Sequence, residues 1–227
     1  MATLKKQILG EVSGSLGGFT FRGVKGKNVI GVKPTSRNIP NDEAAINRRK
    51  IFGLSTKLAA AIISDEQLKT LWKERTPYEL NVHNYILQQN YVNITPDGLS
   101  DMVKLVPEIG FPVTVNSVNK TSSQLSVVLN TLSENSGFRN AGETKIRITA
   151  LLYMSNPVDD TFPAFMFKAV ASTDINIVTD QPMAFNISLD GMIGVLYQKY
   201  SEHKMYYAFI TSDNNSNIIQ YSDTYIG

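Results

Sequence analysis

The spacing of apolar residues changes twice along the chain. Up to residue 40, two short β-rich runs at 19–22 and 29–32 flank Lys25-Gly26-Lys27-Asn28, a pattern typical of a β-hairpin. From residue 41 to 98, apolar residues recur at intervals of three and four, which indicates helices. From residue 99 to 227 the period becomes two, which indicates strands. The pattern therefore predicts three parts: a hairpin arm (1–40), a helical region (41–98) and a β-domain (99–227).

The first part is rich in glycine, with seven of the fifteen glycines lying between residues 10 and 34. We expect the glycines before the hairpin to form a flexible or closely packed arm. A hairpin of this size is too small to be stable alone, so it must pack against something else.

Three helix starts are expected in the second part. Pro40 followed by Asp42 and Glu43 places acidic residues in a first helical turn. Ser64 with Gln67 three residues later fits a capping box, and Thr76-Pro77-Tyr78-Glu79 fits another with proline at the first helical position. The apolar stripe of the first helix consists of Ile51, Leu54, Leu58 and Ile62. Residues 95–98, Thr-Pro-Asp-Gly, are expected to link the helices to the β-domain.

The third part contains several short strands with turn signals between them, among them Asn156-Pro157. Seven or eight short strands in about 115 residues favour an antiparallel, immunoglobulin-like β-sandwich. The expected fold class is α+β, with an N-terminal hairpin arm, a small helical cluster and then the sandwich. The strand-like runs fall at 113–115, 125–127, 146–148, 165–167, 185–189 and 207–210.

Charge is distributed unevenly, although the whole chain carries only +2. Residues 1–60 hold eleven Lys or Arg and three Asp or Glu, a net charge of +8, and the rest of the chain is acidic. Such a concentration favours an acidic partner, either another protein or nucleic acid, unless the cations only solvate the arm and one helix face. No helix-turn-helix, zinc-finger or aromatic RNA-binding motif supports nucleic acid, which is the less favoured partner. The candidate partner-binding residues are Lys5, Lys6, Arg22, Lys25, Lys27, Lys33, Arg37, Arg48, Arg49 and Lys50.

The residue inventory excludes several kinds of chemistry. With no cysteine, the chain has no thiolate nucleophile, disulfide or Cys-based zinc site. The two histidines, His83 and His203, lie 120 positions apart, so they do not share one metal motif. We expect His83 to form a surface hydrogen bond with Glu79, four residues earlier, and His203 to lie in a hairpin turn.

Two further motifs do not support catalysis or cofactor binding. Residues 14–18, Gly-Ser-Leu-Gly-Gly, lack the following Lys-Ser/Thr and the preceding strand of a phosphate-binding loop. The carboxylate pairs at 42–43 and 65–66 lie in first helical turns, where they complement the helix dipole. The pair at 159–160 could bind calcium, but the usual alternating Asp spacing is missing. We therefore predict no enzyme activity, no catalytic residue, no metal and no cofactor.

No segment has the pattern of a signal peptide or a membrane-spanning helix; the longest apolar run, 58–63, ends after six residues. We therefore expect a protein that is made in a bacterial cytoplasm, stays off the membrane and leaves the cell by assembly or lysis.

The two ends of the chain together resemble a known protein family, found in Bacteroidetes bacteria and their phages, including crAss-like phages. The resemblance is clearest over the first sixty residues, and the chain departs from it at Gly31, where the family usually has a basic residue. The family's motifs carry no assigned chemistry, so the resemblance implies a phage or prophage setting but no site residue. The matching runs are Ile8-Leu9-Gly10, Ser13-Gly14-Ser15-Leu16-Gly17-Gly18-Phe19-Thr20-Phe21, Gly26-Lys27-Asn28-Val29-Ile30, Lys33-Pro34, Arg48-Arg49-Lys50-Ile51-Phe52, Tyr207-Ala208-Phe209-Ile210-Thr211-Ser212-Asp213 and Tyr221-Ser222-Asp223-Thr224-Tyr225-Ile226-Gly227.

These observations favour a structural virion protein of a tailed phage. Its basic arm would attach it to other virion proteins, and it would form a homo-oligomeric ring in the tail, collar or portal vertex, since an arm that cannot bury its own surface suits head-to-tail assembly. The alternative is an immunoglobulin-like binding module that recognises a surface carbohydrate or protein.

Overall fold

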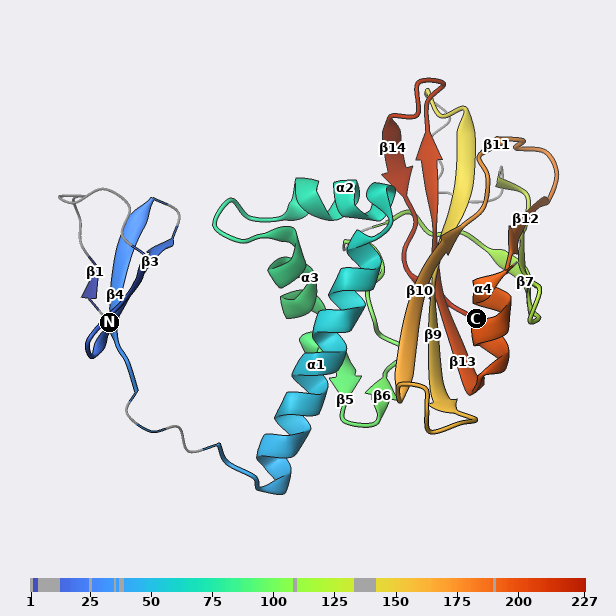
Figure 1. The fold of residues 1–227 in the computed structure, drawn as a ribbon. Coiled ribbons are helices and arrows are strands. Elements are labelled where there is room, and N and C mark those ends of the chain that lie inside the picture. The colour runs from blue at the N-terminus through green and yellow to red at the C-terminus, as the bar shows by residue number, and fades with distance from the viewer. Residues whose placement is uncertain are drawn as a thin grey trace. The chain divides into compact units, whose positions relative to one another are not determined.

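The chain forms two compact units, Met1–Ala45 and Ile46–Gly227 (Figure 1). The computed structural model describes residues 2–3 (backbone only), 13–24, 26–34, 36, 39–107, 110–132, 142–189 and 191–227.

The first unit contains a four-stranded antiparallel sheet with the order β1-β4-β3-β2. The predicted hairpin is present as β3 and β4, joined by a tight turn where Gly26 has a φ of +73°. This left-handed conformation costs glycine little, because it has no Cβ. The glycine-rich segment before the hairpin adds β2 to the sheet. The strands are β1 (Ala2–Thr3), β2 (Gly14–Leu16), β3 (Phe19–Val24) and β4 (Lys27–Val32).

Three helices follow, as the 3–4 spacing predicts. The Asp42 carboxylate accepts a hydrogen bond from the Ala45 amide at 2.6 Å and so caps the first helix. The predicted stripe is buried at Leu54, Leu58 and Ile62. The helices are α1 (Glu43–Ile63), α2 (Glu66–Arg75) and α3 (Val82–Asn90), followed by the short 3-10 helix η1 (Tyr91–Asn93).

Two of the predicted helix caps are wrong by a few residues. Asp65, not Ser64, caps α2: its carboxylate accepts hydrogen bonds from the amides of Gln67 and Leu68. Residues 77–80 form a turn, and α3 begins only after Asn81, whose side chain accepts a hydrogen bond from the Asn84 amide at 2.7 Å. In both places a nearby Asp or Asn competes with the predicted cap, and both residue types rank high at this position.

Residues 95–98 do not form a linker. They close a two-stranded hairpin of β5 (Ile94–Thr95) and β6 (Gly98–Leu99). Ile94 and Leu99 are buried in the core that the helices share with the β-domain. The prediction of a turn at Pro96 and Gly98 is therefore confirmed. The turn closes a hairpin, however, and does not separate two domains.

The β-domain is the predicted immunoglobulin-like sandwich. One sheet has the order β12-β8-β7, and the other has the order β10-β9-β13-β14, with β11 and β15 pairing beside β9 and β13. In immunoglobulin lettering these are strands E-B-A and C′-C-F-G. The strands are β7 (Val115–Lys120), β8 (Gln124–Leu129), β9 (Lys145–Pro157), β10 (Phe165–Ala171), β11 (Ile175–Asn176), β12 (Met183–Ser188), β13 (Tyr200–Ser212), β14 (Ile218–Tyr221) and β15 (Tyr225–Ile226).

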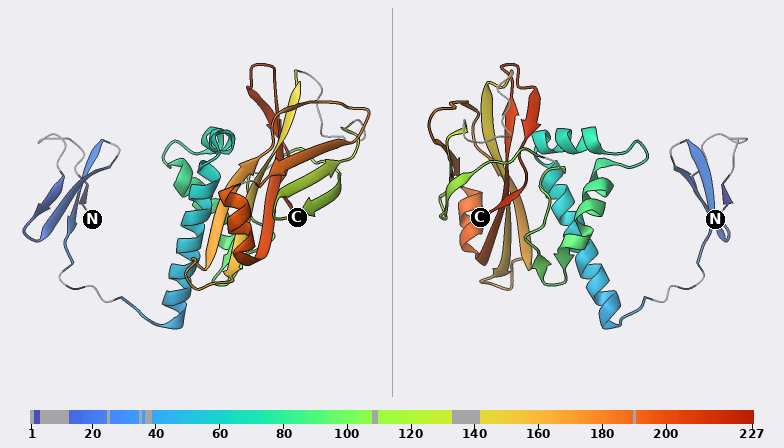
Figure 2. Two further views of the ribbon diagram at one scale, coloured as in Figure 1. Left: turned by 45° about the vertical axis from the view of Figure 1, so that its right-hand side comes forward. Right: turned by 180° about the vertical axis from the view of Figure 1, so that it is seen from behind.

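The large sheet separates two hydrophobic cores. The three-stranded sheet packs against one face, and helices α1–α3 pack against the other (Figures 1 and 2). Strands β9 and β13 are central and contribute alternate side chains to each core: Leu152 and Tyr207 point to one, Leu151 and Tyr206 to the other. Because both faces are covered, these strands read as continuous apolar runs rather than as alternating ones.

Three features of the sandwich differ from the prediction. Strand β9 continues through Asn156-Pro157, where a turn was expected. His203 lies inside β13 and not in a hairpin turn. A short helix, α4 (Met192–Gln198), precedes β13 and packs Ile193 and Tyr197 against the sandwich core; the sequence pattern predicted no helix here.

Within the described residues, none of the helices is both long enough and apolar enough to span a membrane.

Candidate functional site

The ten predicted partner-binding cations do not all fall in one unit. Arg22, Lys27 and Lys33 belong to the first unit, and the run 48–50 lies on α1 in the second. Lys5, Lys6, Lys25 and Arg37 lie outside the described residues. Two candidate sites therefore emerge, one on the N-terminal sheet and one beside α1.

The N-terminal sheet carries a row of apolar side chains on one face. Leu16 is opposite Phe19 in the β2–β3 pair, and Phe19 is opposite Val32 in the β3–β4 pair. Directly opposed residues project from the same face of a sheet, so these three side chains form a continuous row. Their exposed fractions are 74%, 51% and 77%, respectively.

The same face continues toward Phe21 and Ile30, which are paired with each other and half-buried. The opposite face carries Arg22 and Lys27, both exposed, and Thr20, whose hydroxyl donates to the Gly31 carbonyl at 3.2 Å. The sheet thus presents one apolar face and one mixed face, on which Arg22 and Lys27 lie beside Val24 and Val29.

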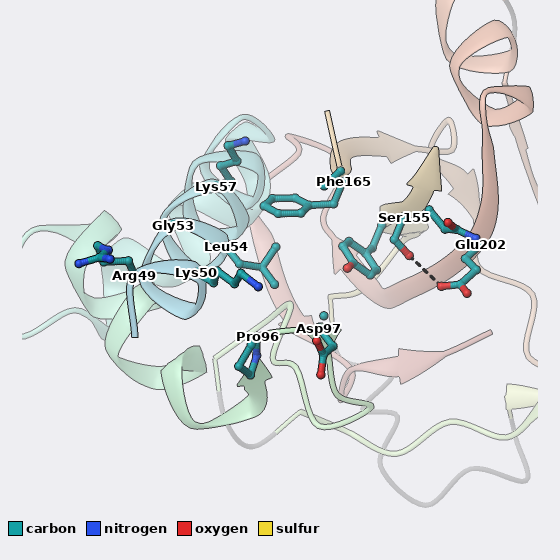
Figure 3. A pocket seen from close by; sticks show the side chains of 14 residues that line it. Arg49, Lys50, Gly53, Leu54, Lys57, Pro96, Asp97, Ser155, Phe165 and Glu202 are labelled. Atoms are coloured by element: carbon teal, nitrogen blue, oxygen red, sulfur yellow. Dashed lines mark hydrogen bonds between the residues drawn. The ribbon is translucent and has the colours of Figure 1, made fainter. Parts of the chain in front are cut away.

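The second candidate site is a cavity of about 650 Å³ beside α1 (Figure 3). It is built by α1, the β5–β6 hairpin, the adjoining ends of β9 and β10, and β13. Its lining residues are Arg49, Lys50, Gly53, Leu54, Lys57, Pro96, Asp97, Gly98, Tyr153, Ser155, Asn156, Ala164, Phe165 and Glu202.

The walls of this cavity differ in charge. The cations Arg49, Lys50 and Lys57 all come from α1, whereas Asp97 and Glu202 come from the hairpin and β13. Figure 3 shows Phe165 next to α1, with Ser155 and Glu202 on the far side. A cavity of this kind suits a ligand that is partly apolar and carries polar groups at both ends.

Two contacts hold side chains of the walls in place. The Lys57 Nζ atom lies 4.7 Å from the centre of the Phe165 ring, within cation–π range. Across the cavity, the Ser155 hydroxyl donates to the Glu202 carboxylate at 3.1 Å.

Tyr153 lies in the buried part of the cavity. Burial raises the pKa of its hydroxyl, a hydrogen bond with the Ser155 side chain lowers it, and the Glu202 charge raises it again, so that the net shift is upward. The Tyr153 hydroxyl therefore keeps its proton at physiological pH. It can form a hydrogen bond to a group in the cavity, but it does not act as a base. The Tyr153 side chain also packs closely against Gly98, whose φ is +151°. A Cβ at this position would lie only 2.9 Å from the Tyr153 Oη atom, so the close approach requires glycine.

The two histidines have structural contacts in the fold. The His83 Nε2 atom lies 3.2 Å from the Thr56 carbonyl oxygen and joins α3 to α1, so the expected surface contact with Glu79 is wrong. The His203 ring stacks on Tyr197 with 3.7 Å between ring centres.

The acidic pair at 159–160 also has a local contact. The Asp159 carboxylate accepts a hydrogen bond from the Thr161 amide at 2.9 Å, and this bond lowers the pKa of Asp159. In the part of the chain that the structure describes, no three His, Asp or Glu side chains gather as a metal site would require.

Comparisons with known proteins add little to this geometry. No protein-family model matches the sequence, and no curated protein matches it. Among solved structures, the chain is similar to DesR, a β-glucosidase from Streptomyces venezuelae crystallised with D-glucose, at 12% identity and a TM-score of 0.23. The match covers 54% of this chain and 16% of the enzyme. A similarity this weak indicates neither activity nor ligand.

The sequence pattern predicted two cations of the second site, Arg49 and Lys50, but not Lys57 or the opposite wall. Ser155, Phe165 and Glu202 lie on three different strands, and no local spacing joins them. Only the pairing of β9 with β10 and β13 brings them together: Ser155 is opposite Phe165 in one pair and opposite Glu202 in the other.

Proposed function

We propose that this protein is a structural assembly protein of a phage virion, made in the host cytoplasm. In this proposal it attaches to an acidic neighbouring virion protein through its N-terminal sheet and forms part of a ring in the tail, collar or portal vertex. The phage setting comes from the resemblance of the sequence to the Bacteroidetes phage family.

The observation that carries the proposal is the exposed apolar row of Leu16, Phe19 and Val32. Exposed apolar clusters of this kind, when bordered by polar residues, mark interaction sites. A sheet of four short strands also buries little surface of its own, so it gains stability from docking.

The basic residues on the opposite face give the attachment its preference for an acidic partner. Residues 1–45 contain seven Lys or Arg and three Asp or Glu, a net charge of +4. This net charge attracts an acidic protein from a distance and accelerates association, even where the cations lie outside the buried interface. Apolar burial therefore holds the partner, and the cations select it.

Incorporation into particles tests this proposal. In a phage or prophage whose own copy of the gene is deleted, the variant Phe19→Glu should reduce the amount of the protein in purified virions by about tenfold or more, because it places a charge in the centre of the row. The matched control is Val158→Glu, which adds the same charge at a position 72% exposed in the second unit. Quantitative mass spectrometry of the particles gives the ratio.

Two results would count against the proposal in different ways. Normal incorporation of Phe19→Glu would show that the row is not the attachment surface. Absence of the unmodified protein from purified virions would reject the virion assignment itself.

The cavity beside α1 favours a second candidate, a binding module that recognises a surface carbohydrate or protein. Its aromatic side chains, Tyr153 and Phe165, lie next to the polar groups of Ser155 and Glu202, which fits the composition of a small-molecule site. Calorimetric titration of the full chain with neutral mono- and disaccharides, alongside a Phe165→Ala variant, tests this candidate. Saccharide binding that the variant abolishes would support it.

A further inference from the structure

Strand β10 forms one edge of the large sheet. It pairs with β9 on one side, from Phe165 opposite Ser155 to Ala171 opposite Thr149. Among the described residues, none donates to or accepts from its outward backbone groups. The opposite edge differs, because the Phe111 amide donates to the Tyr221 carbonyl of β14 at 2.9 Å. An unpaired edge of seven residues is a template for another strand.

A second cavity of about 600 Å³ runs beside this edge. One of its walls is α1, which presents the small side chains Ala60, Ala61 and Ser64. Ile193 of α4 also lines it, and Lys57 and Phe165 are shared with the first cavity. Because these α1 side chains are small, they leave open space next to β10. Larger side chains at the same positions would fill this space.

The side chains of β10 offer contacts to an added strand. Phe165, Phe167 and Ala169 pack toward the helices but stay only partly buried. Met166 and Lys168 project from the other face of the strand, as the period of two requires. Apolar side chains at alternate positions of an incoming strand would complete the burial of the first three.

The positive charge of the groove beside β10 favours an acidic binding partner. The described lining of this groove contains two lysines, Lys57 and Lys168, and no carboxylate. An incoming segment with acidic residues would complement them, whereas the chain's own N-terminal unit is itself basic, with seven Lys or Arg and three Asp or Glu.

A second copy of the chain is also disfavoured at this edge. Lys168 is the middle residue of β10, so two copies paired antiparallel about the strand centre would place Lys168 opposite Lys168. Like charges directly opposite each other destabilise a strand pair. A lysine at this position protects the edge against self-pairing and leaves it open to an acidic strand.

We propose that the β10 edge binds an extended segment of another protein, in which apolar and acidic residues alternate, as an added strand of the large sheet. The backbone of β10 supplies the hydrogen bonds, and Phe167 and Ala169 supply apolar contact on the helix side. Lys168, on the face to which the acidic residues of the segment project, supplies the charge preference. This surface belongs entirely to the second unit and does not depend on the attachment proposed for the N-terminal sheet.

The test uses the full chain and a labelled synthetic peptide of about nine residues in which valine and glutamate alternate, enough to pair along β10. Fluorescence anisotropy should detect binding, and hydrogen exchange should slow by about tenfold or more within residues 165–171. Residues 218–221, on the opposite edge, serve as the internal control and should keep their exchange rates. A peptide with lysine in place of glutamate should bind at least about fivefold more weakly.

Variants separate strand addition from simple charge attraction. Lys168→Glu should weaken binding of the glutamate peptide by about fivefold and strengthen binding of the lysine peptide. The matched control Lys73→Glu changes an exposed lysine on α2, outside the groove, and should leave both affinities unchanged.

Three outcomes would overturn the proposal. One is no binding of the glutamate peptide at about 1 mM, a concentration at which even weak specific complexes form. Another is binding without slower exchange in residues 165–171. The third is a dimer of the free chain, seen by sedimentation, in which these amides are already protected, because that result assigns the edge to a second copy.

Discussion

At the scale of single residues, the buried tyrosines of β13 are the groups whose ionisation the fold changes most. The pKa of Tyr207 is raised to about 12, mainly by burial and further by the neighbouring Tyr225. Burial also raises the pKa of Tyr206, whose hydroxyl donates to the Ser100 carbonyl at 2.9 Å. Both side chains must stay neutral while the core is intact.

This predicts a loss of stability at alkaline pH. Above about pH 10 the tyrosines of the unfolded chain lose their protons while folded Tyr207 keeps its own, so the unfolded state binds fewer protons and stability falls until about pH 12. Tyr207 alone should account for a loss on the order of 2 kcal/mol. Urea unfolding at pH 8, 10 and 11 should show a smaller decline for Tyr207→Phe than for the unmodified chain.

The control for this experiment is Tyr78→Phe, because Tyr78 is 98% exposed. It should leave the pH dependence unchanged. An equal decline in the unmodified chain and in Tyr207→Phe would contradict the assignment.

At the scale of elements, one ion pair joins the helices to the large sheet. The Arg147 guanidinium of β9 lies 3.0 Å from the Asp65 carboxylate, and both side chains are largely buried. The same carboxylate caps α2 through two backbone amides. Asp65 therefore orients a helix and anchors it to the sheet, which is why the cap lies here and not at Ser64.

Replacement of Asp65 should accordingly be costly. Asp65→Ala removes the cap and leaves the Arg147 charge largely buried without this partner, so the free energy of unfolding should fall by about 2–4 kcal/mol. Ser64→Ala should change it by less than about 0.5 kcal/mol, because the exposed Ser64 hydroxyl donates only to the Ala61 carbonyl. Urea denaturation of both variants measures the difference. If Ser64→Ala lowered the free energy of unfolding more than Asp65→Ala did, Ser64 and not Asp65 would be the residue that caps α2.

At the scale of the whole molecule, the two units differ in how they are stabilised. Both hydrophobic cores consist of residues from 51 onward and so belong to the second unit. Among its described residues, the first unit exposes Leu16, Phe19 and Val32 on one sheet face. The division of roles that we propose follows from this difference: one unit carries the stability, and the other carries an attachment surface.

A shortened chain tests this division. A chain that begins at residue 40 keeps the Asp42 cap of α1 and both cores. Its melting temperature should lie within about 3 °C of that of the full chain, since no core residue is removed. Differential scanning calorimetry of the two chains gives the comparison, and a decrease of about 10 °C or more would show that the N-terminal unit stabilises the rest.

Local patterns predicted most of the elements. Strand-length apolar runs, alternating or continuous, located the main strands, and the period of 3.6 located α1, because each reflects which faces of an element are buried. The same logic explains the misses. Asp65 and Asn81 replaced the predicted caps, and α4 was not foreseen because its seven residues carry too few periods to signal a helix.

The sequence by itself determined the α+β class, the sandwich, the basic N-terminal end and the absence of cysteine chemistry, since these depend on composition and on short-range periodicity. Only the tertiary structure decided that the helices cover one face of the large sheet, that 95–98 is a hairpin, and that β10 has an open edge beside a groove. The reason is physical: the pairing of β9 with β10 and β13 depends on contacts between residues up to 67 positions apart, which no local pattern records.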